Sequence, residues 1–291
     1  MKFLKNLRYL LKHNLKKESQ KFITKEELNL ILDGIKYELA DDLKNLKMPN
    51  IKSSEETISE LINKKASFCR FGDGEFMLMN GEDIPFQKYD EKLSRKLSEI
   101  FQSNDPNIFI GIPYPWYNSI YNLRDYIKNF IRSFVAKNRD KLTALCNPAQ
   151  QYYDAACTQN YAAYKQLDFV TYFNGIKKIW LDRDIVIICG KTVFDKIKVN
   201  IFDCAKSVEY QYAPSMNAFA EYDKILNQAK KIDKSKLVII ILGPTATVLA
   251  YDLAKQGYEA IDFGHIAKDY DFYRKKIDHT DQEFEDFFKP D

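Results

Sequence analysis

The sequence predicts an α/β fold in which helices cover both faces of a mostly parallel β-sheet. From residue 51 onward, short apolar segments alternate with segments of helical periodicity. Strands buried on both faces are apolar along their length, and helical connections between them favour parallel pairing. Glycines and polar residues follow the predicted strands, and the carboxyl ends of parallel strands are where such sheets bind ligands. We therefore expect a catalytic body over 51–291, after a helical extension over 1–50.

The extension is expected to contain two helices. Residues 1–17 carry six Lys or Arg and no acid, with apolar residues at helical spacing. This pattern fits a basic amphipathic helix on an anionic membrane surface, and equally a helix packed on the protein itself or on a partner subunit. Residues 25–47 favour a second helix, with Thr24 as its N-cap and two acids in its first turn. Met48-Pro49-Asn50 ends this pattern.

The elements of the body follow in chain order. Strands are expected at 66–71, 107–112, 169–173, 184–190, 207–212, 236–242 and 258–263. Helices are expected at 55–64, 91–102, 122–137, 149–164, directly after 190–192, and at 217–231 and 247–256.

Composition excludes several classes of protein. A net charge of +3 is too small to indicate a nucleic-acid partner. Five cysteines without a Cys-x-x-Cys pair predict reduced thiols rather than a disulfide framework. Three histidines leave little room for a His-based zinc site, and no apolar run approaches the length of a membrane span. We expect a cytoplasmic protein, with peripheral contact at the inner face of the membrane if residues 1–17 bind lipid.

The first predicted strand leads into residues that suit a metal and a phosphate. Gly72 and Gly74 allow a ligand to approach the backbone, and Asp73 and Glu75 would point to the same side of an extended chain. Two carboxylates suit Mn²⁺ or Mg²⁺, which takes further ligands from water or substrate phosphates. Arg70 is suited to gripping phosphate or carboxylate. The alternative is an Asp-Gly hairpin turn with a solvated Glu75.

Four later strand exits carry similar residues, so five exits are expected to converge on one crevice. They are Gly190-Lys191-Thr192, Pro214-Ser215-Met216-Asn217, Gly243-Pro244-Thr245 and Gly264-His265. The loop at 243–247 also opens a helix, whose free N–H groups form a phosphate site. A P-loop is excluded because Ile185 stands where its first glycine would be, and no complete Gly-x-Gly-x-x-Gly fingerprint supports a dinucleotide site.

In this order, several of the stretches resemble the bacterial GT-D-type glycosyltransferases. The similar residues are Arg70-Phe71-Gly72-Asp73-Gly74-Glu75, Ser215-Met216-Asn217-Ala218-Phe219 with Tyr222, Leu242-Gly243-Pro244-Thr245-Ala246 continuing through 249–257, and Ala260-Ile261-Asp262-Phe263-Gly264-His265. The similarity covers roughly 52–275. It implies a Rossmann-like fold of GT-D type, a UDP-sugar donor and a divalent metal held by a D-x-E motif, which falls on Asp73 and Glu75.

The resemblance implies a metal-dependent hexosyltransferase that moves sugar from a UDP-sugar to a glycan or lipid-linked acceptor. Such acceptors occur in bacterial surface polysaccharide, lipooligosaccharide or glycoprotein assembly. The expected catalytic residues are Asp73, Glu75 and His265, with Mn²⁺ or Mg²⁺ on the two carboxylates. The expected nucleotide-sugar contacts are Arg70, Gly72, Gly74, Ser215, Asn217, Gly243, Pro244 and Thr245.

Several alternatives stay open at this point. His265 is a candidate base, a candidate metal ligand or a structural histidine. The family often carries an acid two positions after Gly-His, where this chain has Ala267. The whole chain could instead be a non-catalytic UDP-binding module at the membrane or a metal-dependent nucleotide-sugar phosphohydrolase. It could also form a homo-oligomer through 1–47.

Overall fold

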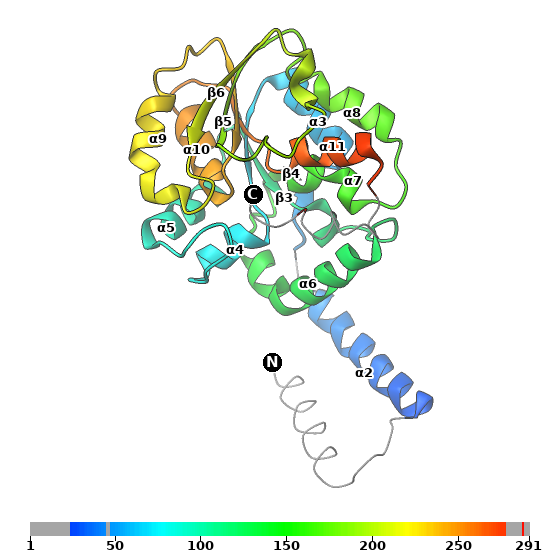
Figure 1. Cartoon of the computed structure of the whole chain (residues 1–291). Coiled ribbons are helices and arrows are strands. Elements are labelled where there is room, and N and C mark those ends of the chain that lie inside the picture. Colours follow the sequence, from blue (N-terminus) through cyan, green and yellow to red (C-terminus); the bar gives the residue numbers. More distant parts are fainter. Residues whose placement is uncertain (1–23, 45–46, 278–286, 288–291) are drawn as a thin grey trace. The chain divides into compact units, whose positions relative to one another are not determined.

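The computed structural model describes residues 24–44, 47–277 and 287 (Figure 1). The chain divides into two compact units, Met1–Lys47 and Met48–Asp291. In the first unit, α2 spans Lys25–Lys44, and Thr24 caps it by accepting the N–H of Glu27 at 3.1 Å. The second predicted helix is thus confirmed over 25–44. The basic segment 1–17 lies outside the described residues, and no described helix is long and apolar enough to cross a membrane.

The described residues of the second unit form one eight-stranded sheet in which every pairing is parallel. The strand order is β1-β4-β3-β2-β8-β7-β5-β6. The strands are β1 Asn50–Ile51, β2 Ser67–Arg70, β3 Ile108–Ile112, β4 Gln151–Asp154, β5 Asp184–Gly190, β6 Ser207–Ala213, β7 Leu237–Ile241 and β8 Ala260–Asp262. The predicted parallel α/β sheet is confirmed.

Helices cover both faces of this sheet (Figure 1). The longer helices are α3 Ser54–Lys64, α4 Asp73–Met79, α5 Glu91–Phe101, α6 Asp125–Leu145, α8 Phe169–Lys177, α9 Tyr222–Ala229, α10 Pro244–Ala254 and α11 Ile266–Lys275; the short turns are α7 Asn160–Ala163, η1 Tyr114–Trp116, η2 Ala155–Thr158, η3 Ile201–Cys204 and η4 Ala218–Glu221. Alternate residues of β7 point to opposite faces. Val238 and Ile240 pack with α5, α9 and α10, whereas Leu237 and Ile239 pack with α3, α8 and α11.

Several predicted elements were wrong. The segment 169–173 begins helix α8, because a five-residue apolar run fits a buried helix as well as a strand and Asp168 caps it by accepting the N–H of Thr171. The predicted helix at 149–164 is instead β4, η2 and α7. There the buried Asp154 accepts the N–H groups of Tyr114 and Ala156 and turns the chain out of the sheet.

Two further helices differ from expectation. The segment after Gly190 is a series of turns rather than a helix. The helix expected at 217–231 begins with the short turn η4, and its α-helical part α9 covers only Tyr222–Ala229. Asn217 explains the late start, because it adopts the left-handed conformation with φ 51° and so cannot belong to a helix.

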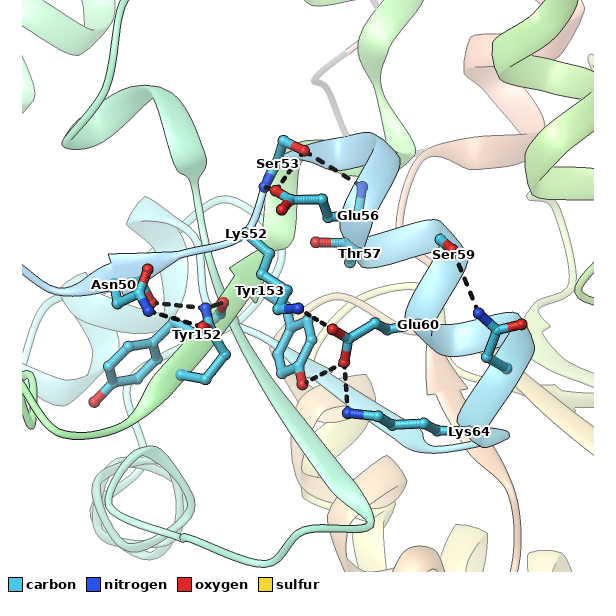
Figure 2. Close-up of polar contacts among 12 residues, drawn as sticks. Asn50, Lys52, Ser53, Glu56, Thr57, Ser59, Glu60, Lys64, Tyr152 and Tyr153 are labelled. Carbon is cyan, nitrogen blue, oxygen red and sulfur yellow. Dashed lines mark hydrogen bonds and ion pairs between the residues drawn. The ribbon is translucent and has the colours of Figure 1, made fainter.

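Polar side chains fasten α3 to the edge of the sheet (Figure 2). Ser53 and Glu56 form a capping box at the start of the helix. Glu60 accepts hydrogen bonds from Lys64 at 2.6 Å and from the Tyr153 hydroxyl at 3.1 Å, and it also pairs with Lys52. Partial burial raises the pKa of Glu60, but hydrogen bonds from Lys52, Lys64 and Tyr153 outweigh it and lower the pKa to about 2.

Candidate active site

The five strand exits predicted to converge belong to five neighbouring strands, β2, β8, β7, β5 and β6. Since all of these strands are parallel, their carboxyl ends lie along one edge of the sheet. With strands about 4.8 Å apart, the row extends roughly 19 Å from β2 to β6. The exits therefore form a continuous row, and each predicted residue has a place along it.

Asp73 and Glu75 lie at the start of a helix and not in an extended turn. Gly72 is the N-cap of α4, and Glu75 folds back to accept the Gly72 N–H at 2.7 Å. Each helical residue turns the chain by about 100°, so the expectation that both side chains leave on one side was wrong. The hairpin alternative is excluded as well. What the two carboxylates share is the N-terminal turn of one helix, where free N–H groups favour negative charge.

Burial makes both of these carboxylates harder to ionise. Burial raises the pKa of Asp73. Burial also raises the pKa of Glu75 to about 7; the Gly72 N–H opposes this rise, and the nearby Asp262 carboxylate adds to it. A cation beside them would favour the ionised forms.

The donor set of the site fits a hard divalent cation. Within the described ranges, no group of three His, Cys, Asp or Glu is placed to hold a metal. Mn²⁺ or Mg²⁺ on Asp73 and Glu75 would complete its shell with water and substrate oxygens, as hard cations commonly do. Both residues offer carboxylate oxygens and no sulfur or imidazole, so the pair fits such a cation and does not fit structural zinc.

Arg70 connects β2 to β8 and to η2 instead of extending into open space. Its Nε and Nη2 both lie 3.3 Å from Asp262 Oδ1. Its Nη1 donates to Ala155 O at 2.9 Å and to Thr158 Oγ1 at 2.8 Å. Asp262 Oδ1 also accepts the Gly264 N–H at 3.2 Å. With these donors committed to the protein, the described contacts make Arg70 a residue that positions the strand exits.

Gly264 gives Arg70 the room that it needs. Its φ is +43°, and a Cβ placed on it would lie 1.9 Å from Arg70 Nη2. The guanidinium therefore packs directly on the backbone after β8, a position that only glycine accommodates. The glycine predicted beside His265 thus serves the packing of Arg70.

His265 stands between two aromatic rings. Its ring centroid lies 6.4 Å from that of Phe86 and 5.4 Å from that of Phe287. Burial lowers its pKa to about 3, and the charges of Lys268 and Arg70 act in the same direction. The imidazole is therefore neutral at physiological pH.

The start of α10 is the place predicted for an anion. Gly243, the N-cap, has φ 53° and ψ −143°, a conformation available to glycine, and it is exposed. Pro244 occupies the first helical position. The Thr245 Oγ1 is fully buried, and among the residues that the structure describes it has no hydrogen-bond partner. The Thr245 hydroxyl is thus an unused buried donor at a helix N-terminus, where Pro244 has no N–H and the Ala246 N–H already donates to Gly243 O at 2.9 Å.

Ser215 and Asn217 bond to the protein itself. Ser215 Oγ lies 3.2 Å from Thr192 Oγ1, and a Cβ on Gly190 would approach it to 2.3 Å, so Ser215 joins the exits of β5 and β6. Asn217 Oδ1 accepts the N–H of Lys88 at 2.7 Å. Asn217 thus brings the 84–88 segment to the site.

Sequence reasoning did not single out this segment. A signal was present: Ile84, Pro85 and Phe86 are bulky residues in an otherwise polar connection between α4 and α5. Phe86 contacts both His265 and the region of Gly243. The structure therefore gathers Asp73, Glu75, His265 and the start of α10 around the exits of β2, β8 and β7. Ser215 lies at the far end of the row.

Comparison with known families agrees with this architecture. A family model described as glycosyltransferase GT-D fold matches residues 68–284. The probable glycosyl transferase Gly of Streptococcus gordonii is 30% identical over 239 residues, which cover 79% of this chain and 34% of that protein. Glycosyltransferase GlyD of Streptococcus pneumoniae serotype 4 is 28% identical over 262 residues, which cover 88% of this chain and 30% of that protein. The chain thus spans about a third of the length of these relatives.

Solved structures share the fold. A selenomethionine-substituted structure of domain of unknown function 1792 superposes with a TM-score of 0.76 at 31% identity, covering 80% of this chain and 84% of that one. A second structure, described as showing a distinct glycosyltransferase fold for this domain, gives a TM-score of 0.75 at 31% identity and the same coverage. A glycosyltransferase of this kind from Streptococcus sanguinis gives 0.76 at 28% identity over 80% of this chain and 88% of that one.

Proposed function

This chain belongs to the GT-D family of glycosyltransferases, and on that premise we propose that it moves a sugar from a UDP-sugar to a glycan acceptor with the help of Mn²⁺ or Mg²⁺. The observation that carries the proposal is the position of Asp73 and Glu75. They lie in the first turn of α4 at the exit of β2, in the same row of strand ends as the start of α10. A cation on these carboxylates and a phosphate at the start of α10 would thus lie along one edge of the sheet.

Transfer of the sugar from a UDP-sugar requires the protein to stabilise the leaving diphosphate. A cation held by Asp73 and Glu75 would supply charge stabilisation to that group. The positive end of the α10 dipole would attract its phosphate oxygens, and the Thr245 hydroxyl offers a donor. Arg70 supports both by fixing Asp262 and the exits of β2 and β8. The hydrogen bonds of Asp262 with Arg70 and Gly264 form without a bound donor, and such preorganisation favours electrostatic catalysis.

The role of His265 follows from its enclosure. A ring with a pKa of about 3 takes a proton poorly at neutral pH, so we assign His265 to the wall of the site. The biological setting is proposed from the family: a glycan or lipid-linked acceptor of surface polysaccharide, lipooligosaccharide or glycoprotein assembly. We also propose that the protein is cytoplasmic, that residues 1–17 contact the membrane and that the chain forms a homo-oligomer.

A calorimetric titration with a panel of UDP-sugars tests the donor site. With Mn²⁺, one UDP-sugar should bind, and a chelator should abolish most of the binding. Asp73→Asn and Glu75→Gln should each weaken binding about tenfold or more. Glu55→Gln is the matched control, because Glu55 is an exposed acid in the first turn of α3 and should leave binding unchanged.

Product analysis separates the alternatives. Transfer of the sugar to an added saccharide supports the proposal. Release of phosphate without an acceptor would indicate a phosphohydrolase, and binding without turnover would indicate a non-catalytic module. If no UDP-sugar binds in either condition, the donor proposal is wrong.

A further inference from the structure

The connection between α4 and α5 contains a closed loop, residues 84–88, which we call the arch. Ile84 and Gln87 exchange backbone hydrogen bonds of 3.0 and 3.2 Å, so the arch closes on itself. Asp83 braces its base by accepting the Tyr89 N–H at 2.7 Å and pairing with the Lys88 ammonium at 3.0 Å. The arch is therefore a defined structure with its own hydrogen bonds.

Residues more than a hundred positions later in the sequence hold the arch by hydrogen bonds. Asn217 donates its N–H to Phe86 O at 2.9 Å, and its Oδ1 accepts the Lys88 N–H at 2.7 Å. The Gln87 side chain, which is 4% exposed, accepts the Phe219 N–H at 3.3 Å and donates to Lys88 O at 3.0 Å. Asn217 has φ 51°, and asparagine is among the residue types that tolerate this conformation.

The arch touches both halves of the proposed donor site. A Cβ on Gly74, between Asp73 and Glu75, would lie 3.1 Å from Ile84 Cδ1. A Cβ on Gly243, the N-cap of α10, would lie 3.6 Å from Phe86 Cβ. Phe86 itself is half-buried, with its ring centroid 6.4 Å from that of His265. The arch thus spans from the carboxylate pair to the anion site.

We infer that Phe86 is a wall of the donor pocket and that Asn217 is a positioning residue, which affects donor binding by holding the arch. This inference rests on the proposed function, and it replaces the expectation that Asn217 touches the nucleotide sugar. The Oδ1 and the backbone N–H of Asn217 are both occupied by the arch. The ligand that meets Phe86 is the diphosphate-linked part of the UDP-sugar, since Phe86 lies beside Gly243 where α10 begins.

Three substitutions at one position separate the contributions of Asn217. Asn217→Asp keeps a side-chain acceptor for the Lys88 N–H and should bind UDP with Mn²⁺ nearly as the parent protein does. Asn217→Gly keeps the backbone conformation and loses the acceptor, so the Kd for UDP and the donor KM should rise about tenfold. Its kcat at saturating donor and its melting temperature should change little. Lys92→Ala is the control, because Lys92 is exposed on α5 and its ammonium pairs with Asp223 and not with the arch.

A double-mutant cycle tests whether Asn217 acts through Phe86. Phe86→Ala alone should raise the Kd for UDP about tenfold. If Asn217 acts only by placing Phe86, Asn217→Gly should add little in the Phe86→Ala background. If the effects of the two substitutions on the Kd for UDP multiply instead, Asn217 contacts the donor independently of Phe86, and the inference is overturned.

Hydrogen exchange of the nucleotide-free protein gives a readout that does not depend on the proposed function. The Lys88 amide should exchange at least about tenfold faster in Asn217→Gly than in the parent or in Asn217→Asp. An unchanged exchange rate of the Lys88 amide would show that Asn217 does not hold the arch. If exchange changes as expected while the parent binds no nucleotide, the proposed donor function fails, and with it the role of Phe86 as a donor wall.

Discussion

Arg70 shows how one side chain fixes several parts of the site. It bonds to Asp262 on β8 and to Ala155 and Thr158 in η2, so it joins strands that are distant in sequence. The side chain is 15% exposed, and its Asp262 partner is 4% exposed. A charge pair with so little solvent is strongly destabilising when it is broken, because one charge is left buried.

Gly264→Ala should displace this pair. The new Cβ would lie 1.9 Å from Arg70 Nη2, and φ is +43°. We expect a loss of about 2 kcal/mol or more in the free energy of unfolding and a large loss of transferase activity. Urea denaturation and a turnover assay check both effects.

The matched control is Gly175→Ala in α8, where a Cβ meets nothing within 4 Å. That substitution should stabilise the protein by about 0.5–1 kcal/mol, because alanine favours a helix. Equal changes in the free energy of unfolding of the two variants would show that the close packing of Gly264 on Arg70 does not matter for stability.

Thr245 and Thr247 give a second prediction at this scale. Both are fully buried in α10, but Thr247 Oγ1 donates to Arg70 O at 2.8 Å whereas Thr245 Oγ1 has no partner in the described ranges. Thr247→Val should therefore lower the free energy of unfolding by about 1–2 kcal/mol. Thr245→Val should leave it unchanged or raise it by up to about 1 kcal/mol, and should weaken UDP binding severalfold.

Chemical denaturation and calorimetry of the two valine variants decide this. A Thr245→Val protein that loses stability but binds UDP normally would show that the hydroxyl serves the fold and not the ligand.

Among the elements, α3 is fastened to the sheet edge by charge. Glu60, 18% exposed, is held by Lys52, Lys64 and the Tyr153 hydroxyl of β4 (Figure 2). Because its pKa is lowered to about 2 in the folded protein, the folded state binds fewer protons than the unfolded state between pH 4.5 and pH 2. The stability from Glu60 is therefore present above pH 4.5 and is lost as the pH falls towards 2.

Glu60→Gln should lower the free energy of unfolding by about 1–2 kcal/mol at pH 7, after allowance for solvent screening. At pH 3 the difference from the parent protein should shrink. Urea denaturation at both pH values measures it, with the exposed Glu55→Gln as control. A difference that stays constant with pH would mean that the charge of Glu60 contributes nothing.

At the scale of the whole molecule, the described residues of the second unit form the eight-stranded sheet and three hydrophobic clusters. Removal of residues 1–47 should therefore leave a protein that folds cooperatively and melts within about 3 °C of the parent. Circular dichroism and calorimetry of the shortened chain check this. Loss of the cooperative transition would show that the second unit depends on the first for its stability.

The sequence by itself determined the fold class, most strands and the glycines and acids of the site. These features depend on local properties: an apolar run must be buried, and a helix needs a cap. The same local logic explains the errors. The run 169–173 suits a buried helix or strand alike, and Asp73 with Glu75 was placed in a turn although Gly72 caps a helix.

Tertiary structure alone decided the partners of the functional side chains. The sequence alone places Arg70, His265 and Asn217 at strand exits. The bond of Arg70 to Asp262, the contact of His265 with Phe86 and the hydrogen bond of Asn217 to Lys88 depend on which strands are neighbours. Strand order brings residues 70 and 262 into contact across 192 positions. Hydrogen bonds and burial over such separations leave no periodic trace in the chain, because they are set by the packed sheet and not by local conformation.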